Sequence, residues 1–306
     1  MGHTHIKPED ILHTGNLELL AKKAVEGFVT GFHKSPFHGF SVEFAEHRQY
    51  NPGESTKNID WKLYGRTDKL YNKRFDEETN LRCQFIVDVS SSMQISQKEG
   101  LSKLQYAIWS VAVFSQLLKK QRDASGICFF DHEIKEYTKI ASSGRHYKEL
   151  LNKLENYLDY NTEQQSTDIS ATLHSIAAQI HRRSLVVLFT DFFQEGKDLE
   201  SMFDAIKHLK HNKHEVIVFH TLHRITELEF DFGAGPLTIE DAETGEKLKL
   251  APSEVKADYM SAVSSYTAEI KSRLNLYKID YVEADTADSI DKALLPFLLK
   301  RKRMIR

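Results

Sequence analysis

The chain has 306 residues, of which 41% are hydrophobic, 10% aromatic and 28% charged, a composition typical of a folded globular protein and not of a disordered one. Its 41 Lys and Arg residues and 44 Asp and Glu residues leave a formal net charge of -3, so no overall positive field favours nucleic acid or an anionic membrane surface. The apolar runs fall far short of the roughly 18 residues that span a bilayer, and the first residues lack the pattern of a secretory signal. These features predict a cytoplasmic protein with no membrane span and no nucleic-acid partner.

The positions of cysteine and histidine indicate a reducing compartment and argue against a zinc site. Cys83 and Cys128 each lie inside an apolar, strand-like run and show no metal-ligand spacing, so we expect two buried, reduced thiols. The 15 histidines are scattered along the chain. None forms a pair four residues apart with a neighbouring Glu, as a helical zinc site would require.

The first segment, residues 1–80, is expected to be an extension of the main fold, with a helix followed by short strands. Apolar residues recur on one face of the predicted helix, namely Leu17, Leu20, Ala21, Ala24, Val25 and Phe28. Gly, Pro, His and Lys break this pattern at residues 31–40, and aromatic and charged residues interleave without helical period at 41–75. That stretch predicts short strands and turns, with one turn at 51–54.

From residue 81 onward, short apolar segments alternate with amphipathic helical segments. The expected strands cover residues 81–87, 126–130, 184–189, 215–221 and 278–282. One helix face is marked by Leu104, Ile108, Val111 and Leu118, another by Ile169, Leu173, Ile176 and Ile180, and a further helix is expected in 199–209. Strands this apolar, separated by helices, predict a sheet that is covered on both faces. We therefore expect residues 81–306 to form an α/β domain with an open, mostly parallel, doubly wound sheet of the Rossmann type.

One interruption of this alternation lies at about residues 227–250. Apolar residues fall there at every second position around turn pairs such as Thr244-Gly245, which predicts an inserted β meander on the rim of the sheet. Two helices, at about 253–274 and 287–299, are expected to complete the fold. The basic residues from Lys300 to Arg306 are expected to form a solvated tail.

Three places near the ends of predicted strands carry side chains with oxygen atoms. Asp88, Ser90 and Ser92 alternate after the first strand of the domain, Thr167 precedes a predicted helix, and Asp191 follows a later strand. Ligand sites of open α/β sheets form at the carboxyl ends of strands, so we expect these side chains to meet there. An all-oxygen set suits a hard, octahedral ion. The predicted ion is Mg2+, with Mn2+ as the alternative, and a partner's carboxylate is expected to take the coordination position that the chain leaves to water.

Each of these residues also has a purely structural interpretation. Asp88 and Ser90 are suited to cap the first turn after their strand, and the carboxylate after the later strand is suited to a turn. Thr167 or Asp168 is well placed to cap the following helix. The coincidence of all three places favours the metal site. Which oxygen near Thr167 binds the ion stays open, because Ser166 and Asp168 flank it.

The pattern Asp88-x-Ser90-x-Ser92, with a later Thr167 and Asp191, resembles the metal-ion-dependent adhesion site (MIDAS) of von Willebrand factor type A domains. The resemblance implies that the two serines bind the ion directly. It also implies that the aspartates and the threonine act directly or through water.

The preceding segment resembles the signature of domain-of-unknown-function family 58, whose members are commonly linked with MoxR-type AAA ATPases. The residues that carry this resemblance are Gly39, Glu43-Phe44, Arg48-x-Tyr50, Gly53-Glu54, Ile59-Asp60-Trp61, Arg66 and Phe75-x-x-Glu78. Departures from the family pattern are mild: Glu54 replaces the usual Asp, Lys57 the usual Arg and Gly65 the usual Ala. Trp61 and Tyr64 are expected to pack as structural aromatics, with a partner-docking surface as the alternative.

Together the resemblances imply a non-enzymatic, metal-dependent protein-binding module. It would act as an adaptor for a MoxR-type AAA ATPase in the maturation or assembly of client proteins. The sequence carries no Gly-x-x-x-x-Gly-Lys loop with which to hydrolyse ATP by that route.

The alternative function is a magnesium-dependent phosphotransferase or phosphatase with Asp88 as the nucleophile. Two features argue against it: Ser90 stands where such enzymes generally carry a second Asp, and no lysine is evident near the strand ends. A third interpretation is a structural module whose site binds no metal.

Overall fold

The computed structural model describes residues 16–32, 46–49, 59–74, 81–96, 100–160, 169–193, 197–211, 213–233, 235, 237–240 and 247–304. The chain divides into two compact units, one formed by Met1–Gly31 together with Leu81–Arg306, and the other by Phe32–Asn80. Among the residues that the structure describes, none of the helices has the length and apolar character that a bilayer-spanning segment needs.

The larger unit is built around a six-stranded sheet with the order β10-β7-β6-β3-β4-β5. Its strands are β3 (Arg82–Asp88), β4 (Ala124–Phe130), β5 (Ile134–Tyr137), β6 (Leu185–Thr190), β7 (Glu215–Leu222) and β10 (Asp280–Asp285). All neighbouring pairs in this sheet are parallel except β4 and β5, which pair antiparallel at the edge. The predicted α/β class with a mostly parallel sheet is confirmed, and the edge strand β5 is an addition that the sequence analysis did not include.

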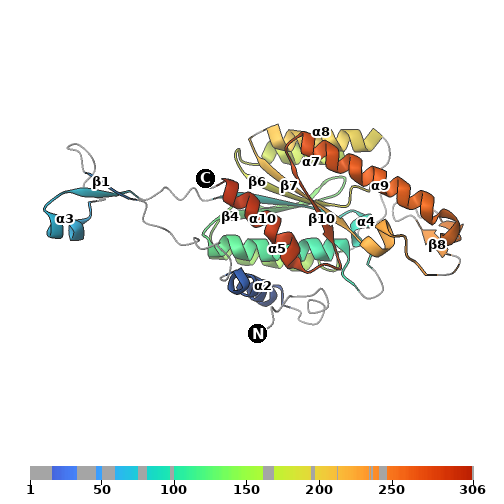
Figure 1. Ribbon diagram of the computed structural model, residues 1–306, viewed down its shortest axis with the longest axis horizontal. Helices are drawn as coiled ribbons and strands as arrows, with labels where there is room; N and C mark the ends of the chain where they lie inside the picture. Colours follow the sequence, from blue (N-terminus) through green and yellow to red (C-terminus); the bar gives the residue numbers. More distant parts are fainter. Residues whose placement is uncertain are drawn as a thin grey trace. The chain divides into compact units, whose positions relative to one another are not determined.

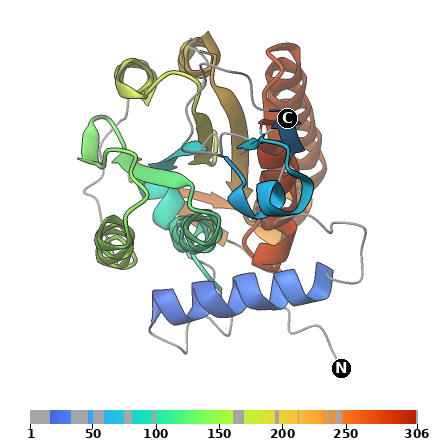
Figure 2. The ribbon, with the colours of Figure 1, turned by 90° about the vertical axis from the view of Figure 1, so that its left-hand side faces the viewer.

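Helices cover both faces of this sheet (Figures 1 and 2). The described helices of the unit are α2 (Leu17–Phe32), α4 (Ser91–Gln94), α5 (Lys103–Lys120), α6 (Gly144–Asn156), α7 (Ile169–Gln179), α8 (Lys197–His211), α9 (Pro252–Leu276) and α10 (Ile290–Met304). Helices α2, α5, α6 and α10 share one buried apolar cluster with the sheet, and α7, α8 and α9 share another. The sheet is therefore doubly wound, as predicted.

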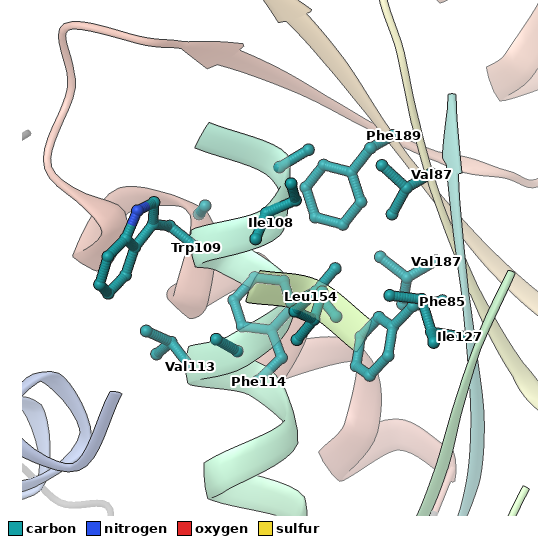
Figure 3. Packing of buried hydrophobic residues seen from close by; sticks show 14 of the residues in the cluster. Phe85, Val87, Ile108, Trp109, Val113, Phe114, Ile127, Leu154, Val187 and Phe189 are labelled. Atoms are coloured by element: carbon teal, nitrogen blue, oxygen red, sulfur yellow. The ribbon is translucent and has the colours of Figure 1, made fainter. Parts of the chain in front are cut away.

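Alternation along each strand supplies both clusters. In β3, Phe85 and Val87 belong to the cluster under α5, whereas Ile86 belongs to the cluster under α7 and α8, because successive side chains point to opposite faces of a sheet. Figure 3 shows Phe114 of α5 pointing toward the strand residues, and its ring stacks on that of Phe297 with centroids 4.4 Å apart. Since both faces are apolar, polar side chains gather where the strands end.

The two cysteines lie within this core. Cys83 and Cys128 are both buried and free, which confirms the prediction of two reduced thiols. Burial raises the pKa of both thiols, that of Cys128 to about 12, so neither is prone to form the reactive thiolate near neutral pH.

The β meander predicted at residues 227–250 is wrong in its first part. Residues Arg224–Leu228 form a π-helical turn, and β8 (Leu237–Glu240) and β9 (Lys247–Leu250) pair antiparallel in a separate two-stranded sheet. Phe230 has a φ of 49°, which an extended strand does not allow. It is buried against Tyr259, with ring centroids 4.4 Å apart. The apolar spacing there reflects packing onto α9 and not a pleated strand.

The C-terminal helix corrects a second prediction. Lys300 is part of α10 and is buried, with its ammonium 2.7 Å from a carboxylate oxygen of Glu215 and 3.1 Å from one of Asp280. The expectation of a solvated tail is therefore wrong for Lys300, which joins α10 to the sheet.

The smaller unit contains strands β1 (Glu46–Gln49) and β2 (Tyr71–Arg74), which pair antiparallel, and helix α3 (Trp61–Thr67) between them in sequence. The short strands agree with the sequence analysis, but the helix was not predicted. It begins at Asp60, whose carboxylate accepts the backbone N–H groups of Lys62 and Leu63 at 3.0 and 3.1 Å. Trp61 is 62% exposed, and its ring meets that of Tyr64 edge to face with the centroids 6.2 Å apart. The turn predicted at 51–54 lies outside the described residues.

Candidate functional site

The strands β3 and β6 define the place where a ligand site is expected. They are neighbours in the sheet, and the chain leaves them in opposite directions: β3 leads through α5 to β4, and β6 leads through α8 to β7. Such a reversal is the topological switch point of an open α/β sheet, where ligands bind outside the carboxyl ends of the strands. Asp88 ends β3 and Asp191 directly follows β6, so both carboxylates lie at this point.

Asp88 is fully buried, and both of its carboxylate oxygens accept hydrogen bonds. One carboxylate oxygen accepts the backbone N–H of Ser90 at 2.9 Å, and the other accepts the hydroxyl of Thr190 at 2.8 Å. The Ser90 bond is the turn-capping contact that a structural role predicts. The Thr190 bond reaches across from β6, so the carboxylate also joins the two central strands.

The serine hydroxyls connect Asp88 to Asp191. Ser90 occupies the N-cap position of α4, but its side chain makes no capping hydrogen bond. Its Oγ lies 3.2 Å from Oγ of Ser92, and the Ser92 side chain hydrogen-bonds that of Asp191. The structure thus brings together Asp88, Ser90, Ser92 and Asp191. Thr167, with its neighbours 166 and 168, lies outside the described residues.

A buried lysine that the sequence analysis missed completes the cluster. The ammonium of Lys103 lies 2.7 Å from Oδ2 of Asp191 and 2.8 Å from Oε1 of Glu227. Lys103 is the first residue of α5, placed there by a capping box between Ser102 and Gln105. A buried cation at a helix N-terminus is unfavourable by itself, so the two carboxylates are what hold it in this position.

The charges at the site shift the pKa values of its members. Burial and the neighbouring charge of Asp191 raise the pKa of Asp88 to about 7, although the hydrogen bonds from Ser90 and Thr190 oppose this shift. Burial works to raise the pKa of Asp191, but the Lys103 ammonium, together with hydrogen bonds from Phe193 and Ser92, outweighs it and holds that pKa below its ordinary value. Burial alone would lower the pKa of Lys103; Asp191 and Glu227 reverse this and raise it to about 12.

These residues fit a divalent cation through oxygen chemistry alone. Within the described part of the chain, no group of three or more His, Cys, Asp or Glu side chains is arranged to hold a metal ion, so an ion at this point depends on the hydroxyls of Ser90 and Ser92. Two buried carboxylates disfavour each other's ionised form, and the charge of Asp191 is the second cause, after burial, that raises the pKa of Asp88. A divalent cation between them would reverse that effect, and hydroxyl and carboxylate oxygens are ligands that Mg2+ accepts.

A buried histidine, His220, contacts the backbone of Asp191. Nε2 of His220 donates to the backbone carbonyl of Asp191 at 3.0 Å, since a carbonyl can only accept, and the Tyr281 hydroxyl therefore donates to Nδ1 at 2.8 Å. Burial lowers the pKa of His220, which favours this neutral form. These hydrogen bonds fix the position of the backbone at Asp191.

Of the two site residues that were not predicted, Lys103 and Glu227, only Lys103 had a recognisable signal in the sequence. The Ser-x-x-Gln capping box identifies Lys103 as the first residue of a helix that follows β3, so its place at the carboxyl edge of the sheet could have been inferred. Glu227 offered no such signal, because the pattern around it was interpreted as a strand.

Comparison with known proteins shows distant similarity over most of the chain. An uncharacterized protein of Mycobacterium tuberculosis, Rv1480, is 22% identical over 258 residues, which cover 83% of this chain and 78% of the relative. An uncharacterized protein of Mycobacterium bovis, Mb1516, matches to the same extent.

Two solved structures also match this chain at low identity. The conserved hypothetical protein BatB from Bacteroides thetaiotaomicron matches with a TM-score of 0.44 and 17% identity, over 73% of this chain and 98% of that one. The pilus adhesin SpaC from Lactobacillus rhamnosus GG matches with a TM-score of 0.45 and 12% identity, over 75% of this chain and 31% of that one.

A family model also matches most of the chain. The family model "Protein of unknown function DUF58" matches residues 46–269, which include both strands of the smaller unit and most of the larger one. The family resemblance found in the sequence is confirmed by this match, and the chain belongs to the DUF58 family.

Proposed function

We propose that this chain is a non-enzymatic, metal-dependent protein-binding module with a von Willebrand factor A-like domain. Asp88, Ser90, Ser92 and Asp191, together with Thr167, would hold Mg2+ or Mn2+ in an adhesion-type site. The observation that carries the proposal is the convergence of the first four side chains at the switch point of the sheet, in a chain of hydrogen bonds from Thr190 to Asp191.

The chain's own residues prepare the site in three ways. Thr190 and the backbone of Ser90 orient the Asp88 carboxylate. Lys103 keeps Asp191 ionised. The serine hydroxyls are neutral ligands, so they would offset less of the ion's charge than further carboxylates would, and an open coordination position could take a carboxylate from another protein.

The partner in this proposal is a MoxR-type AAA ATPase or one of its clients, and the location is the cytoplasm. Support comes from the family membership, since the resemblance that identified the family also links its members with such ATPases. In this role the chain would act as an adaptor during maturation or assembly of the client.

One observation favours the alternative, a magnesium-dependent phosphotransferase with Asp88 as nucleophile. The lysine that was not evident in the sequence is Lys103, which lies at the strand ends. However, two carboxylates already bind its ammonium, and the raised pKa of Asp88 makes it a weak nucleophile near neutral pH. Magnesium-dependent hydrolysis of a generic phosphate ester that Asp88→Asn abolishes would favour the enzyme.

The proposed ion is tested by thermal denaturation in Mg2+ and in EDTA. A ligand of the native state stabilises it by about 2.7 kcal/mol at a concentration of one hundred times Kd, so Mg2+ should raise the Tm of the wild-type protein. The double variant Ser90→Ala with Ser92→Ala removes two hydroxyls and no core volume. It should keep the metal-free Tm within a few degrees and lose the response to Mg2+; an unchanged response would refute the site.

A further inference from the structure

The two edges of the six-stranded sheet differ in charge. Four strands, β3, β4, β6 and β10, end at or directly before an aspartate, namely Asp88, Asp131, Asp191 and Asp285. The opposite edge, called the amino edge below, consists of the starts of the parallel strands and the turns that lead into them. Exposed basic residues gather at the amino edge: Arg82, Arg122, Arg182, Arg183, Lys213 and Lys278. The formal net charge of -3 therefore conceals a positively charged edge.

Backbone pairing brings the turns of the amino edge next to one another. Arg82 lies opposite Ala124, the first residue of β4, in the register of β3 and β4. The N–H of Glu215, the first residue of β7, donates to the carbonyl of Ser184 at 3.1 Å. The Arg82 guanidinium reaches the turn before β6, with Nη1 2.7 Å from Nδ1 of His181. The basic residues of these turns thus belong to one continuous surface.

Carboxylates at the amino edge do not neutralise this surface. Asp123 is buried and accepts a backbone N–H at 3.0 Å. Glu215 and Asp280 both bind the ammonium of the buried Lys300, at 2.7 and 3.1 Å. Within the described ranges of the chain, none of the six exposed basic residues forms an ion pair with Asp or Glu. Their charge is therefore available to a partner.

Four of these basic residues have a backbone conformation that favours glycine. Arg122, Arg183, Lys213 and Lys278 have φ angles of 60°, 60°, 61° and 56°, and each lies in the turn between a helix and the next strand. A cation complements the dipole at the carboxyl end of a helix, but glycine would adopt this conformation with less strain. The same exchange of glycine for a basic residue in four separate turns favours a further role for the charge.

An exposed leucine indicates which anionic partner fits the amino edge. Leu276, the last residue of α9, is 76% exposed and precedes Lys278 by two positions. Basic side chains beside an exposed apolar one suit the surface of an anionic bilayer, where the charges meet headgroups and the apolar side chain enters the boundary with the acyl chains.

Nucleic acid fits this edge less well. Its phosphates would meet the same charges, but it offers no apolar phase to a leucine, and single strands are bound by exposed aromatic rings that stack on bases. Among the described residues of these turns, the one Phe, Tyr or Trp is Tyr277, which is half-buried and has the Lys207 ammonium 5.5 Å from its ring centroid.

We infer that the amino edge of the sheet binds the surface of a membrane that contains anionic phospholipids. This inference goes beyond the proposed function and does not depend on the proposed ion. Bound in this way, the chain lies on the bilayer without entering it beyond Leu276. The carboxyl edge, with Asp88 and Asp191, then faces away from the lipid and stays open to a protein partner.

Co-sedimentation of the full chain with lipid vesicles tests the inference. We expect binding to vesicles of phosphatidylcholine with phosphatidylglycerol to be about tenfold tighter, or more, than binding to phosphatidylcholine alone. It should weaken as NaCl is raised, because salt screens the charges. Equal binding to both vesicles, or no binding to either, would overturn the inference. So would tighter binding, by fluorescence anisotropy in the same buffer, to a labelled DNA duplex or single-stranded RNA.

A double variant, Arg183→Gly with Lys213→Gly, removes two charges without straining the fold. Glycine accepts the positive φ at both positions, so the Tm should stay within a few degrees of wild type. Each basic residue near an anionic surface contributes roughly fivefold to binding, so we expect the variant to bind the anionic vesicles about tenfold more weakly, or less. Lys247→Gln with Lys249→Gln is the matched control, because it changes the net charge equally at exposed positions of β9. Equal losses in the two double variants would show that only net charge matters and that the amino edge is not the binding surface.

Leu276→Ser tests the apolar contact with the bilayer. It should weaken binding to the anionic vesicles about threefold or more, whereas Leu248→Ser, at a residue that is 63% exposed on β9, should bind as wild type does. If Leu276→Ser also binds as wild type does, the leucine does not enter the bilayer, and the argument for lipid over other polyanions fails.

Discussion

The ammonium of Lys103 lies 2.7 Å from a carboxylate oxygen of Asp191, and both side chains are buried. A lysine is rarely buried unless it is paired, and here a second bond to Glu227 completes the pairing. The contact joins the first residue of α5 to the residue that follows β6 and to the π-helical turn. The proposed ion site therefore already contains one fixed positive charge, which any bound cation must accommodate.

Lys103→Met should destabilise the protein more in EDTA than in Mg2+. Without metal the substitution leaves Asp191 and Glu227 without their counter-charge, and breaking a buried pair in this way costs about 3–5 kcal/mol. A bound ion would partly replace the lost charge. Urea unfolding under both conditions measures the difference, and an equal loss in both would show that no ion binds near Asp191.

Lys210→Met is the matched control for that experiment. Lys210 also pairs with a carboxylate, 2.7 Å from Glu215, but its side chain is partly exposed and lies at the opposite end of β7. Because Lys300 also binds Glu215, we expect a loss within about 1 kcal/mol that is the same with and without Mg2+.

Gly126→Ala should destabilise the larger unit by about 1–3 kcal/mol, as overpacking of a core does. A Cβ at this position in β4 would lie 2.8 Å from the backbone carbonyl oxygen of Thr138 and 2.8 Å from Oε1 of Gln84. Gly144→Ala serves as control, since nothing lies within 4 Å of a Cβ at the start of α6. Chemical denaturation compares the two variants, and equal stability would contradict the close packing of β4.

His214→Asn should make stability less dependent on pH below about 6.5. His214 is buried, its Nδ1 accepts the N–H of Ser184 at 3.1 Å, and burial lowers its pKa from the ordinary 6.5. Below pH 6.5 the unfolded chain therefore binds a proton that the folded protein does not, and wild-type stability falls by at most about 1.4 kcal/mol per pH unit from this group. Asn keeps an acceptor and does not titrate.

Urea unfolding at pH 7.5, 6.5 and 5.5 measures this contribution as the difference between wild type and variant. His211→Gln is the control, because His211 is exposed at the end of α8. If the gap between wild type and His214→Asn is the same at all three pH values, His214 does not contribute to the pH dependence.

The central strands of the larger unit, β3, β4, β6 and β7, could be predicted because burial on both faces makes each one a largely apolar run. The first was expected at residues 81–87 and spans Arg82–Asp88, and the strand expected at 184–189 spans Leu185–Thr190. Helix α6 was missed although its buried residues Tyr147, Leu150, Leu151 and Leu154 have helical spacing. The polar residues between them outnumber this narrow stripe.

The π-helical turn could not be predicted from local pattern. The apolar residues from Leu228 to Phe232 fall at every second position, which is the spacing of a strand. Only the left-handed backbone at Phe230 and its packing on Tyr259 exclude a strand there. Both depend on α9, which follows later in the chain.

The candidate site was predictable only in part for a similar reason. Strand ends identified Asp88, Ser90, Ser92 and Asp191, since parallel strands bring their carboxyl ends to one edge. The burial of Lys103 depends on Glu227, 124 positions away in sequence. A lysine at the start of a helix otherwise indicates a solvated position.

The most direct test of the proposed ion is a crystal structure of the full chain grown with Mn2+. We expect an anomalous peak within about 2 to 2.6 Å of ligand oxygens, with the hydroxyls of Ser90 and Ser92 among the nearest. Absence of a peak at these side chains, with Mn2+ present at millimolar concentration, would contradict it.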